Sequence, residues 1–148
     1  IEWLLNELLP FCSYVDADPE PKIVSLEHVH HLGTEVAGQL SSPPCSILEL
    51  VNALHPTPAV GGDPQTEALT IIKRVEGIDR RRYAGPVGWL AADGDGEFAV
   101  GIRSAEVKAN TARLYAGVGL VEDSDPQSEL EETEAKFKTM LNTFLPTT

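Results

Sequence analysis

The sequence contains no long apolar run, no excess of basic residues and very little cysteine, and each absence excludes a class of protein. No apolar segment approaches the length that crosses a bilayer, and no basic segment followed by an apolar one opens the chain. Lys and Arg number 11 against 23 Asp and Glu, and the net charge of −12 repels nucleic-acid phosphates and anionic membranes. We therefore expect a cytoplasmic protein that binds neither nucleic acid nor membrane.

The two cysteines and the histidine cluster do not have the spacing of a metal site. Cys12 and Cys45 lack a Cys-x-x-Cys partner, so they are typical of buried thiols, although a disulfide between them stays open. His28 and His30 would share one face of a strand, with His31 beside them, but no third ligand follows at a suitable distance. A zinc site is therefore not predicted.

Apolar periodicity predicts an α+β fold for these 148 residues, of which 42% are hydrophobic. Helical spacing of apolar residues predicts helices in segments 1–9, 45–54 and 65–75, and Asp125-Pro126 has the cap and first-turn proline of a last helix. Segment 22–40 is expected to be strand-rich. Three further segments, 84–91, 97–107 and 111–121, read as successive strands of one antiparallel sheet.

The start of the chain resembles the interior of a longer polypeptide. The predicted helix at residues 1–9 begins with neither Met nor a capping residue, so we expect the chain to be part of something longer. The proline-rich segment 16–21 after it predicts a linker, because proline cannot continue helical hydrogen bonding.

A single cation lies among small residues on the middle predicted strand. Alternation puts Gly101 and Arg103 on one face, and Gly85, Gly117 and Gly119 on the flanking strands would extend a small-residue surface around the guanidinium. Such a surface suits a flat ligand with a carboxylate, which the planar guanidinium fork binds through two parallel hydrogen bonds. The alternative is that the glycines mark sheet bends and that Arg103 pairs with a surface acid.

Two carboxylates project together from the last predicted helix. Glu129, Glu132 and Lys136 share a face through spacings of three and four residues. A carboxylate pair binds Mg²⁺, whose remaining positions are filled by water and ligand oxygens. The alternative is that the acids favour the positive end of the helix dipole and that Glu132 and Lys136 form a solvated ion pair.

His55 stands at the junction between a predicted helix and the loop at residues 55–64, which begins His-Pro-Thr-Pro. The imidazole in that position polarises a ligand hydroxyl or, alternatively, caps the carbonyls at the end of the helix.

A set of motifs in fixed order resembles the chorismate-utilising enzymes. The motifs are His55–Pro64, Tyr83–Trp89, Ala99–Ala105, Tyr115–Gly119 and Glu129–Lys136, with a weaker one at His31–Thr34. The Thr57-Pro58-Ala59 variant of the first motif is similar to that of the isochorismate synthases within the family. The pathway that such a product would feed stays open between menaquinone, siderophore and salicylate synthesis.

The resemblance implies a fold and an activity. The family fold is a large α+β sandwich of antiparallel sheets flanked by helices, and residues 1–148 would be the C-terminal part of that chorismate-binding catalytic domain. The upstream half would be absent from this chain, and the remainder of the same polypeptide would be its packing partner. The implied reaction is the Mg²⁺-dependent isomerisation of chorismate to isochorismate. Its general base and acid would lie upstream, so these residues alone would be inactive.

The resemblance also implies a role for each candidate residue. Arg103 and Tyr83 would hold the enolpyruvyl carboxylate, with help from the backbone amides of Gly117 and Gly119.

At the other end of the substrate, Glu129 and Glu132 would bind Mg²⁺, the metal would bind the ring carboxylate, and Lys136 would order the acidic pair. His55 would lie against the ring as a catalytic residue, and Ala59 would shape the pocket wall.

Two alternatives remain open at this point. A relative with another outcome uses the same scaffold: anthranilate synthase takes ammonia as nucleophile, and salicylate synthase goes on to eliminate pyruvate. A non-catalytic chorismate-binding domain is the other alternative, because the catalytic base and acid do not map onto this chain.

Overall fold

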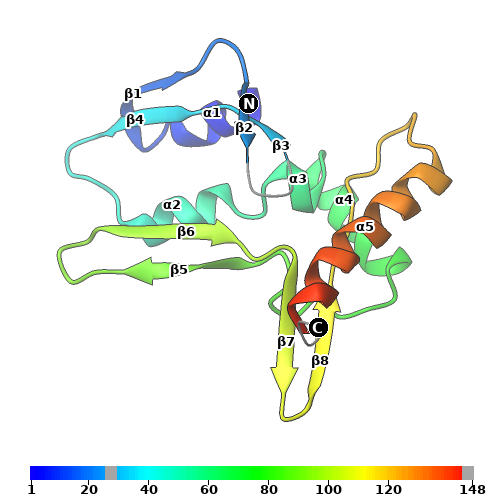
Figure 1. Ribbon diagram of the computed structural model, residues 1–148. Coiled ribbons are helices and arrows are strands. Elements are labelled where there is room, and N and C mark those ends of the chain that lie inside the picture. The colour runs from blue at the N-terminus through cyan, green and yellow to red at the C-terminus, as the bar shows by residue number, and fades with distance from the viewer. Residues whose placement is uncertain (26–29, 145–148) are drawn as a thin grey trace. The chain divides into compact units, whose positions relative to one another are not determined.

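The computed structural model of the protein describes residues 1–25 and 30–144, and its chain forms two compact units (Figure 1). The first unit comprises Ile1–His55 and Trp89–Glu97, and the second comprises Pro56–Gly88 and the chain from Phe98 onward. The candidate site residues belong to the second unit, with the exception of His55.

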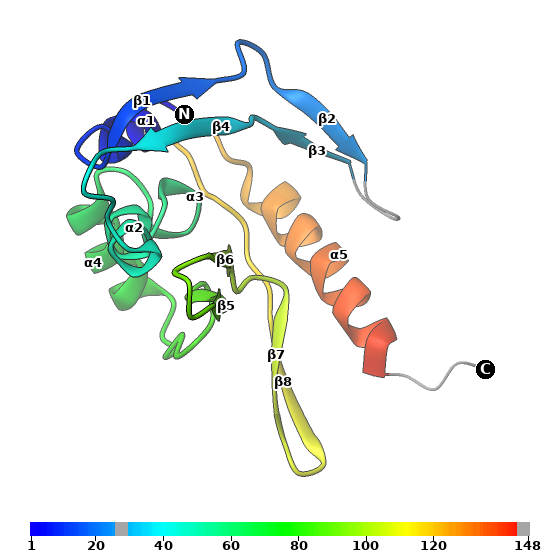
Figure 2. The same cartoon turned by 90° about the vertical axis from the view of Figure 1, so that its left-hand side faces the viewer.

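The first unit is built on a long interrupted hairpin. Its elements are α1 (Glu2–Leu8), β1 (Cys12–Ala17), β2 (Lys22–Ser25), β3 (His30–Gly33), β4 (Val36–Leu40) and α2 (Ile47–Leu54). Strand β1 pairs antiparallel with β4, and β2 with β3, so that one pair continues into the other (Figure 2). The predicted helices at residues 1–9 and 45–54 and the strands within 22–40 are confirmed. The weaker motif at 31–34 overlaps β3, whereas His28 lies outside the described residues.

The linker predicted at residues 16–21 is partly wrong. Asp16 and Ala17 belong to β1, where they pair with Ala37 and Val36 of β4. The prolines that suggested a linker stand beyond the strand end, and pairing with β4 supplies the backbone hydrogen bonds before them. Cys12 at the start of β1 is a free thiol, as is Cys45.

Local capping explains the start of α2. The Ser46 hydroxyl accepts the Glu49 amide at 3.3 Å, and the Glu49 carboxylate accepts the Ser46 amide at 2.8 Å. This reciprocal capping box satisfies two amides that the helix itself leaves without partners.

The second unit contains α3 (Pro58–Gly61), α4 (Gln65–Val75), β7 (Ser104–Lys108), β8 (Thr111–Tyr115) and α5 (Pro126–Phe144), which packs on β8. Helix α4 has the predicted bounds. The predicted cap of the last helix is also confirmed, because the Asp125 carboxylate accepts the Ser128 amide at 2.8 Å. The short helix α3 is an addition inside the predicted loop 55–64, with Pro58 in its first turn.

The predicted three-stranded sheet is wrong. Strand β5 (Pro86–Leu90) pairs with β6 (Gly96–Val100), and β7 pairs with β8, as two separate two-stranded sheets. The predicted middle strand breaks between them, where Arg103 has a left-handed φ of 47° and the Gly101 amide donates to the Gly85 carbonyl at 2.8 Å. A left-handed residue cannot continue a strand, so the face expected for Gly101 and Arg103 does not run on from β6.

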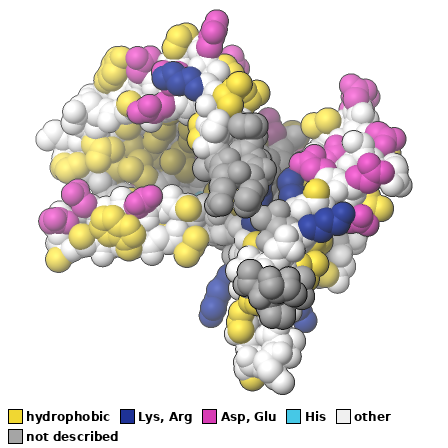
Figure 3. Space-filling view, viewed as in Figure 1, with side chains coloured by type: hydrophobic (Ala, Val, Ile, Leu, Met, Phe, Trp, Pro, Cys, Tyr) yellow, Lys and Arg dark blue, Asp and Glu magenta, His cyan; other side chains and the backbone are white. Residues whose placement is uncertain are grey.

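Few side chains of the described residues are fully buried. The buried apolar ones are Ala84 and Tyr115, with 6% and 7% of their surface exposed. Leu120 and Val121, by contrast, are 72% and 74% exposed, and apolar atoms also gather on the visible face of the first unit (Figure 3). No helix in the described part of the chain is long and apolar enough to cross a membrane.

Candidate functional site

Two stacked tyrosines, the buried Tyr115 and the half-buried Tyr83, lie in the second unit. The rings of Tyr83 and Tyr115 lie 5.2 Å apart between centroids and are inclined by 13°. Tyr115 ends β8, whereas Tyr83 belongs to the turn that precedes β5, so the stack joins two segments distant in the sequence. Burial raises the pKa of Tyr83, so its phenol is a protonated hydrogen-bond donor at neutral pH.

The backbone after β8 passes directly beside the Tyr83 hydroxyl. A Cβ atom added at Gly117 would lie 2.9 Å from that oxygen, which is closer than a real side chain tolerates. A side chain at this position would force the phenol to shift, so glycine allows the chain to approach it. The carbonyl of Gly117 in turn accepts a hydrogen bond from the Lys136 ammonium at 3.0 Å.

Lys136 connects this backbone segment to the acidic face of α5. Its ammonium lies 2.7 Å from the Glu132 carboxylate, and that contact lowers the pKa of Glu132, with a smaller contribution from the charge of Arg103. A series of contacts thus runs from Tyr83 through Gly117 and Lys136 to Glu132, and the charge of Arg103 contributes to the lowered pKa of Glu132. The structure brings these five predicted residues together although the predicted sheet is absent.

Glu129 is held by a residue that sequence analysis missed. The Ser124 hydroxyl donates to one Glu129 carboxylate oxygen at 2.7 Å and accepts the Val121 amide at 3.1 Å. Because the backbone amide occupies the acceptor side of this hydroxyl, its single proton points at Glu129. Serine two residues before Pro126 was the available signal, but it is also typical of an ordinary helix start.

A groove lies against this carboxylate. It has a volume of about 360 Å³ and runs between the segment after β8 and the first turns of α5, with apolar side chains such as Leu120, Val121 and Leu130 beside Ser124 and Glu129. A carboxylate at the edge of an apolar groove is electrostatically less screened than one in open water.

The donor set on α5 fits a hydrated magnesium ion. Among the described residues, no group of three or more His, Cys, Asp and Glu side chains lies close enough to hold a metal. Glu129 and Glu132 provide two carboxylates one helical turn apart, and the Glu132 side chain is 58% exposed and so open to a ligand. Mg²⁺ uses one or two protein carboxylates and keeps water or substrate oxygens at its other positions.

Three predicted residues are not tied to this cluster by the geometry above. His55 belongs to the first unit, where its backbone amide, and not its ring, donates to the Val51 carbonyl at the end of α2 at 3.0 Å. Burial lowers the pKa of His55, so its imidazole is neutral at pH 7. Ala59 in α3 and Gly119 after β8 are exposed, and their roles stay predictions.

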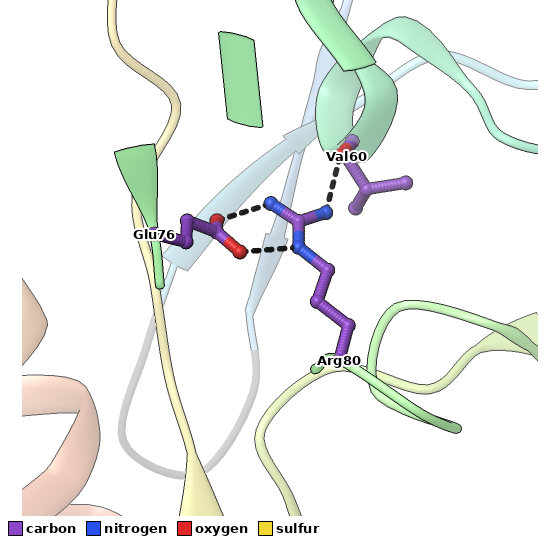
Figure 4. A network of polar contacts seen from close by, with 3 residues as sticks. All are labelled: Val60, Glu76 and Arg80. Carbon is purple, nitrogen blue, oxygen red and sulfur yellow. Dashed lines mark hydrogen bonds and ion pairs between the residues drawn. The ribbon is translucent and has the colours of Figure 1, made fainter. Parts of the chain in front are cut away.

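Arg80, which contacts the Tyr83 ring, is a second residue that sequence analysis missed. Arg80 donates through Nε to Glu76 at 2.8 Å, through a second nitrogen to the other oxygen of that carboxylate, and through its third nitrogen to the Val60 carbonyl at 2.9 Å (Figure 4). Its guanidinium also lies over the Tyr83 ring, 5.8 Å from the centroid. The spacing of four residues between Glu76 and Arg80 was a signal, but it is common on exposed helices.

Comparison with known proteins gives consistent matches along the whole chain. A family model described as "Chorismate binding enzyme" matches residues 1–145. The protein named "Isochorismate synthase MenF" from Bacillus subtilis (strain 168) is 45% identical over 137 residues, which cover 93% of this chain and 29% of the relative. The chain therefore spans about a third of the length of the curated relatives it matches.

Two solved structures share the fold. The crystal structure of a putative 2,3-dihydroxybenzoate-specific isochorismate synthase, DhbC, from Bacillus anthracis matches with a TM-score of 0.93 and 47% identity over 97% of this chain and 38% of that one. Anthranilate synthase component I from Streptococcus pneumoniae TIGR4 matches with a TM-score of 0.76 and 28% identity over 94% of this chain and 32% of that one. The α+β fold expected from the sequence is confirmed by these matches.

Proposed function

The chain belongs to the chorismate-binding enzyme family, and we propose that it is the C-terminal part of an isochorismate synthase, an isomerase that converts chorismate to isochorismate. The relatives named isochorismate synthase are 40% to 47% identical, whereas the anthranilate synthase component is 28% identical. The observation that carries the proposal is the cluster in the second unit, in which contacts lead from the Tyr83 phenol through Gly117 and Lys136 to the acidic face of α5.

The two carboxylates of chorismate match the two kinds of group in this cluster. The Arg103 guanidinium and the protonated Tyr83 phenol donate to the enolpyruvyl carboxylate, and the backbone amides of Gly117 and Gly119 assist them. Arg103 has a left-handed backbone conformation between β6 and β7, which sets the direction from which its side chain approaches the substrate carboxylate. Tyr83 is held by its stack on Tyr115.

We assign the ring carboxylate of chorismate to the acidic face of α5. Glu129 and Glu132 would hold Mg²⁺, and the metal, when bound, neutralises the ring carboxylate and so favours its binding next to two acidic side chains. Ser124 aims one oxygen of Glu129, while Lys136 keeps Glu132 ionised and ties α5 to Gly117. His55 is proposed to lie against the ring as a neutral imidazole, and Ala59 to form part of the pocket wall.

The isomerisation needs more than these residues. Water adds at one ring carbon while a hydroxyl leaves from another and the double bonds shift, so a general base must take a proton from water and a general acid must give one to the leaving hydroxyl. We assign that base and acid to the remainder of the polypeptide, which we also propose as the packing partner of the exposed apolar surface. The residues of this chain bind and orient the substrate.

Product analysis tests the proposed function. The complete polypeptide that includes this chain is incubated with chorismate and Mg²⁺, and isochorismate, salicylate and, with ammonium added, anthranilate are separated by chromatography. We expect isochorismate as the product. Anthranilate or salicylate as the sole product would assign the chain to another member of the family, and chorismate binding without turnover would support the non-catalytic domain.

A first prediction concerns the chain by itself. Expressed alone, residues 1–148 are expected to bind a dye that reports exposed apolar surface, to self-associate, and to give no chorismate turnover, because large side chains such as Leu120, Val121 and Ile23 are more than two-thirds exposed. Dye fluorescence, light scattering and the turnover assay check this. A monomer with a sharp unfolding transition and no dye binding would contradict the proposed packing partner.

A second prediction concerns Ser124. Replacing Ser124 by Ala in the complete polypeptide is expected to weaken Mg²⁺ binding about tenfold, because loss of a group that orients a metal ligand typically has an effect of this size. Isothermal titration with Mg²⁺ measures the effect without turnover. Ser128→Ala, in the first turn of the same helix, is the control, because only its backbone amide takes part in the cap. Unchanged Mg²⁺ affinity in Ser124→Ala would remove Ser124 from the site.

A further inference from the structure

The Arg80 side chain contacts Glu76, Val60 and Tyr83, although it lies outside the predicted substrate contacts. Glu76 holds one edge of the guanidinium with both carboxylate oxygens, and the Val60 carbonyl accepts a third hydrogen bond (Figure 4). The guanidinium carbon also lies over the Tyr83 ring, 5.8 Å from its centroid. The side chains of Arg80 and Glu76 are only 25% and 31% exposed, so the pair is better shielded from solvent than an ordinary surface ion pair.

These contacts join three segments of the second unit. Glu76 caps the end of α4, Val60 belongs to α3, and the turn from Arg80 to Tyr83 is closed by the Tyr83 amide, which donates to the Arg80 carbonyl at 2.7 Å. Helix α3 has only four residues and cannot satisfy its own last carbonyls, so the third guanidinium nitrogen supplies a partner there.

The contacts of Arg80 with Glu76 and Val60, which we call the Arg80 clamp, are connected to the candidate site through the Tyr83 ring. The Tyr83 ring contacts both the Arg80 guanidinium and the Tyr115 ring, and its hydroxyl lies beside the backbone of Gly117. The cation and the second ring both favour this position of the phenol ring. A shift of the guanidinium would therefore move the hydroxyl relative to Gly117.

We propose that Arg80 is a positioning residue, whose guanidinium, clamped by Glu76 and Val60, holds the Tyr83 hydroxyl where it receives the enolpyruvyl carboxylate of the substrate. The inference rests on the proposed function for the identity of that carboxylate. The contact between Arg80 and Tyr83 stands on the geometry alone.

A double-mutant cycle in the complete polypeptide tests the proposal. Arg80→Gln and Tyr83→Phe are each expected to raise KM for chorismate about tenfold with kcat within about threefold, which is the size of one lost hydrogen bond in each case. The double variant is expected to be no worse than either single one, because Arg80 acts through the hydroxyl that Tyr83→Phe removes. Independent effects, about a hundredfold together, or an unchanged KM in Arg80→Gln would overturn the proposal.

A matched control separates the clamp from a general loss of charge. Arg81→Gln removes the same charge one residue away, where the guanidinium pairs with Glu106 and is 53% exposed. Its KM and melting temperature are expected to equal those of the wild type. If Arg80→Gln does not fold, Glu76→Gln replaces it in the cycle, since it weakens the clamp but leaves the arginine in place; additivity with Tyr83→Phe would again overturn the proposal.

A titration without substrate distinguishes this inference from the proposed function. The positive charge of Arg80 lowers the pKa of Tyr83 against the rise caused by burial, so Arg80→Gln is expected to raise that pKa further. The tyrosinate absorbance difference between each protein and its Tyr83→Phe version reports it. An unchanged titration would overturn the contact itself, whereas a shifted titration in a protein that does not turn over chorismate would refute the proposed function and with it only the substrate part of this inference.

Discussion

Replacing Arg103 by Ala in the complete polypeptide is expected to abolish chorismate turnover, with a loss of at least about a thousandfold in kcat/KM, while the protein still folds. Removing one partner of a desolvated charge pair costs about 4 kcal/mol, because the substrate carboxylate is left in the site without its counter-charge. The fold should tolerate the change, since Arg103 already has a left-handed φ of 47° and alanine pays a similar conformational cost there.

Steady-state kinetics and thermal unfolding by circular dichroism measure the two halves of this prediction. Arg113→Ala is the control, because Arg113 is an exposed arginine on β8 of the same unit and is expected to keep normal kinetics. Near-normal kinetics in Arg103→Ala would remove Arg103 from the site. An unfolded variant would instead show that the residue is needed for the turn between β6 and β7. Arg103→Lys, which keeps a charge but loses the planar fork, would then be used for the kinetic test.

The second large effect is expected on α5. Glu129→Gln and Glu132→Gln should each weaken Mg²⁺ binding at least about a hundredfold, equal to ~2.7 kcal/mol, because an amide replaces one of the two α5 carboxylates assigned to the ion. Turnover at fixed Mg²⁺ should fall in parallel and recover in part as Mg²⁺ is raised. Isothermal titration and Mg²⁺-dependent kinetics measure both.

The pH dependence of Mg²⁺ binding follows from the charges around Glu132. Lys136, and to a lesser extent Arg103, lower the pKa of Glu132, so this carboxylate stays ionised to a lower pH than an ordinary glutamate. Mg²⁺ affinity is therefore expected to fall only as the pH drops through that lowered pKa.

The control for the two α5 substitutions is Glu134→Gln, since Glu134 is exposed and lies off the face shared by Glu129 and Glu132. Equal Mg²⁺ affinity in all three variants would exclude α5 as the metal site.

The helices show which features of this protein could be predicted and why. Helix α4 has the predicted bounds, and α5 starts at the predicted proline with Asp125 as its cap. Apolar periodicity and capping involve residues that are close together in the chain, so a single sequence is enough to predict them. Strand β1 was missed because its pairing with β4 joins residues far apart in the chain.

The candidate site divides in the same way. Sequence motifs named Tyr83, Arg103, Gly117 and Lys136, and the structure brings them together, yet not through the sheet that was expected to do so. Arg80 and Ser124 have no motif that separates them from ordinary surface residues. Their importance depends on what lies opposite each side chain, which a single sequence does not state.

Local periodicity, capping and a set of ordered motifs are properties of the chain alone, so the helices, the acidic face of α5 and the family could be predicted without coordinates. The folded chain was needed to show that the strand ends before Arg103, that two tyrosine rings stack, and that Ser124 and Arg80 contact Glu129 and Tyr83. A hydrogen bond or a ring contact between distant residues depends on how the backbone folds back on itself, and a left-handed turn at one residue redirects the chain after it.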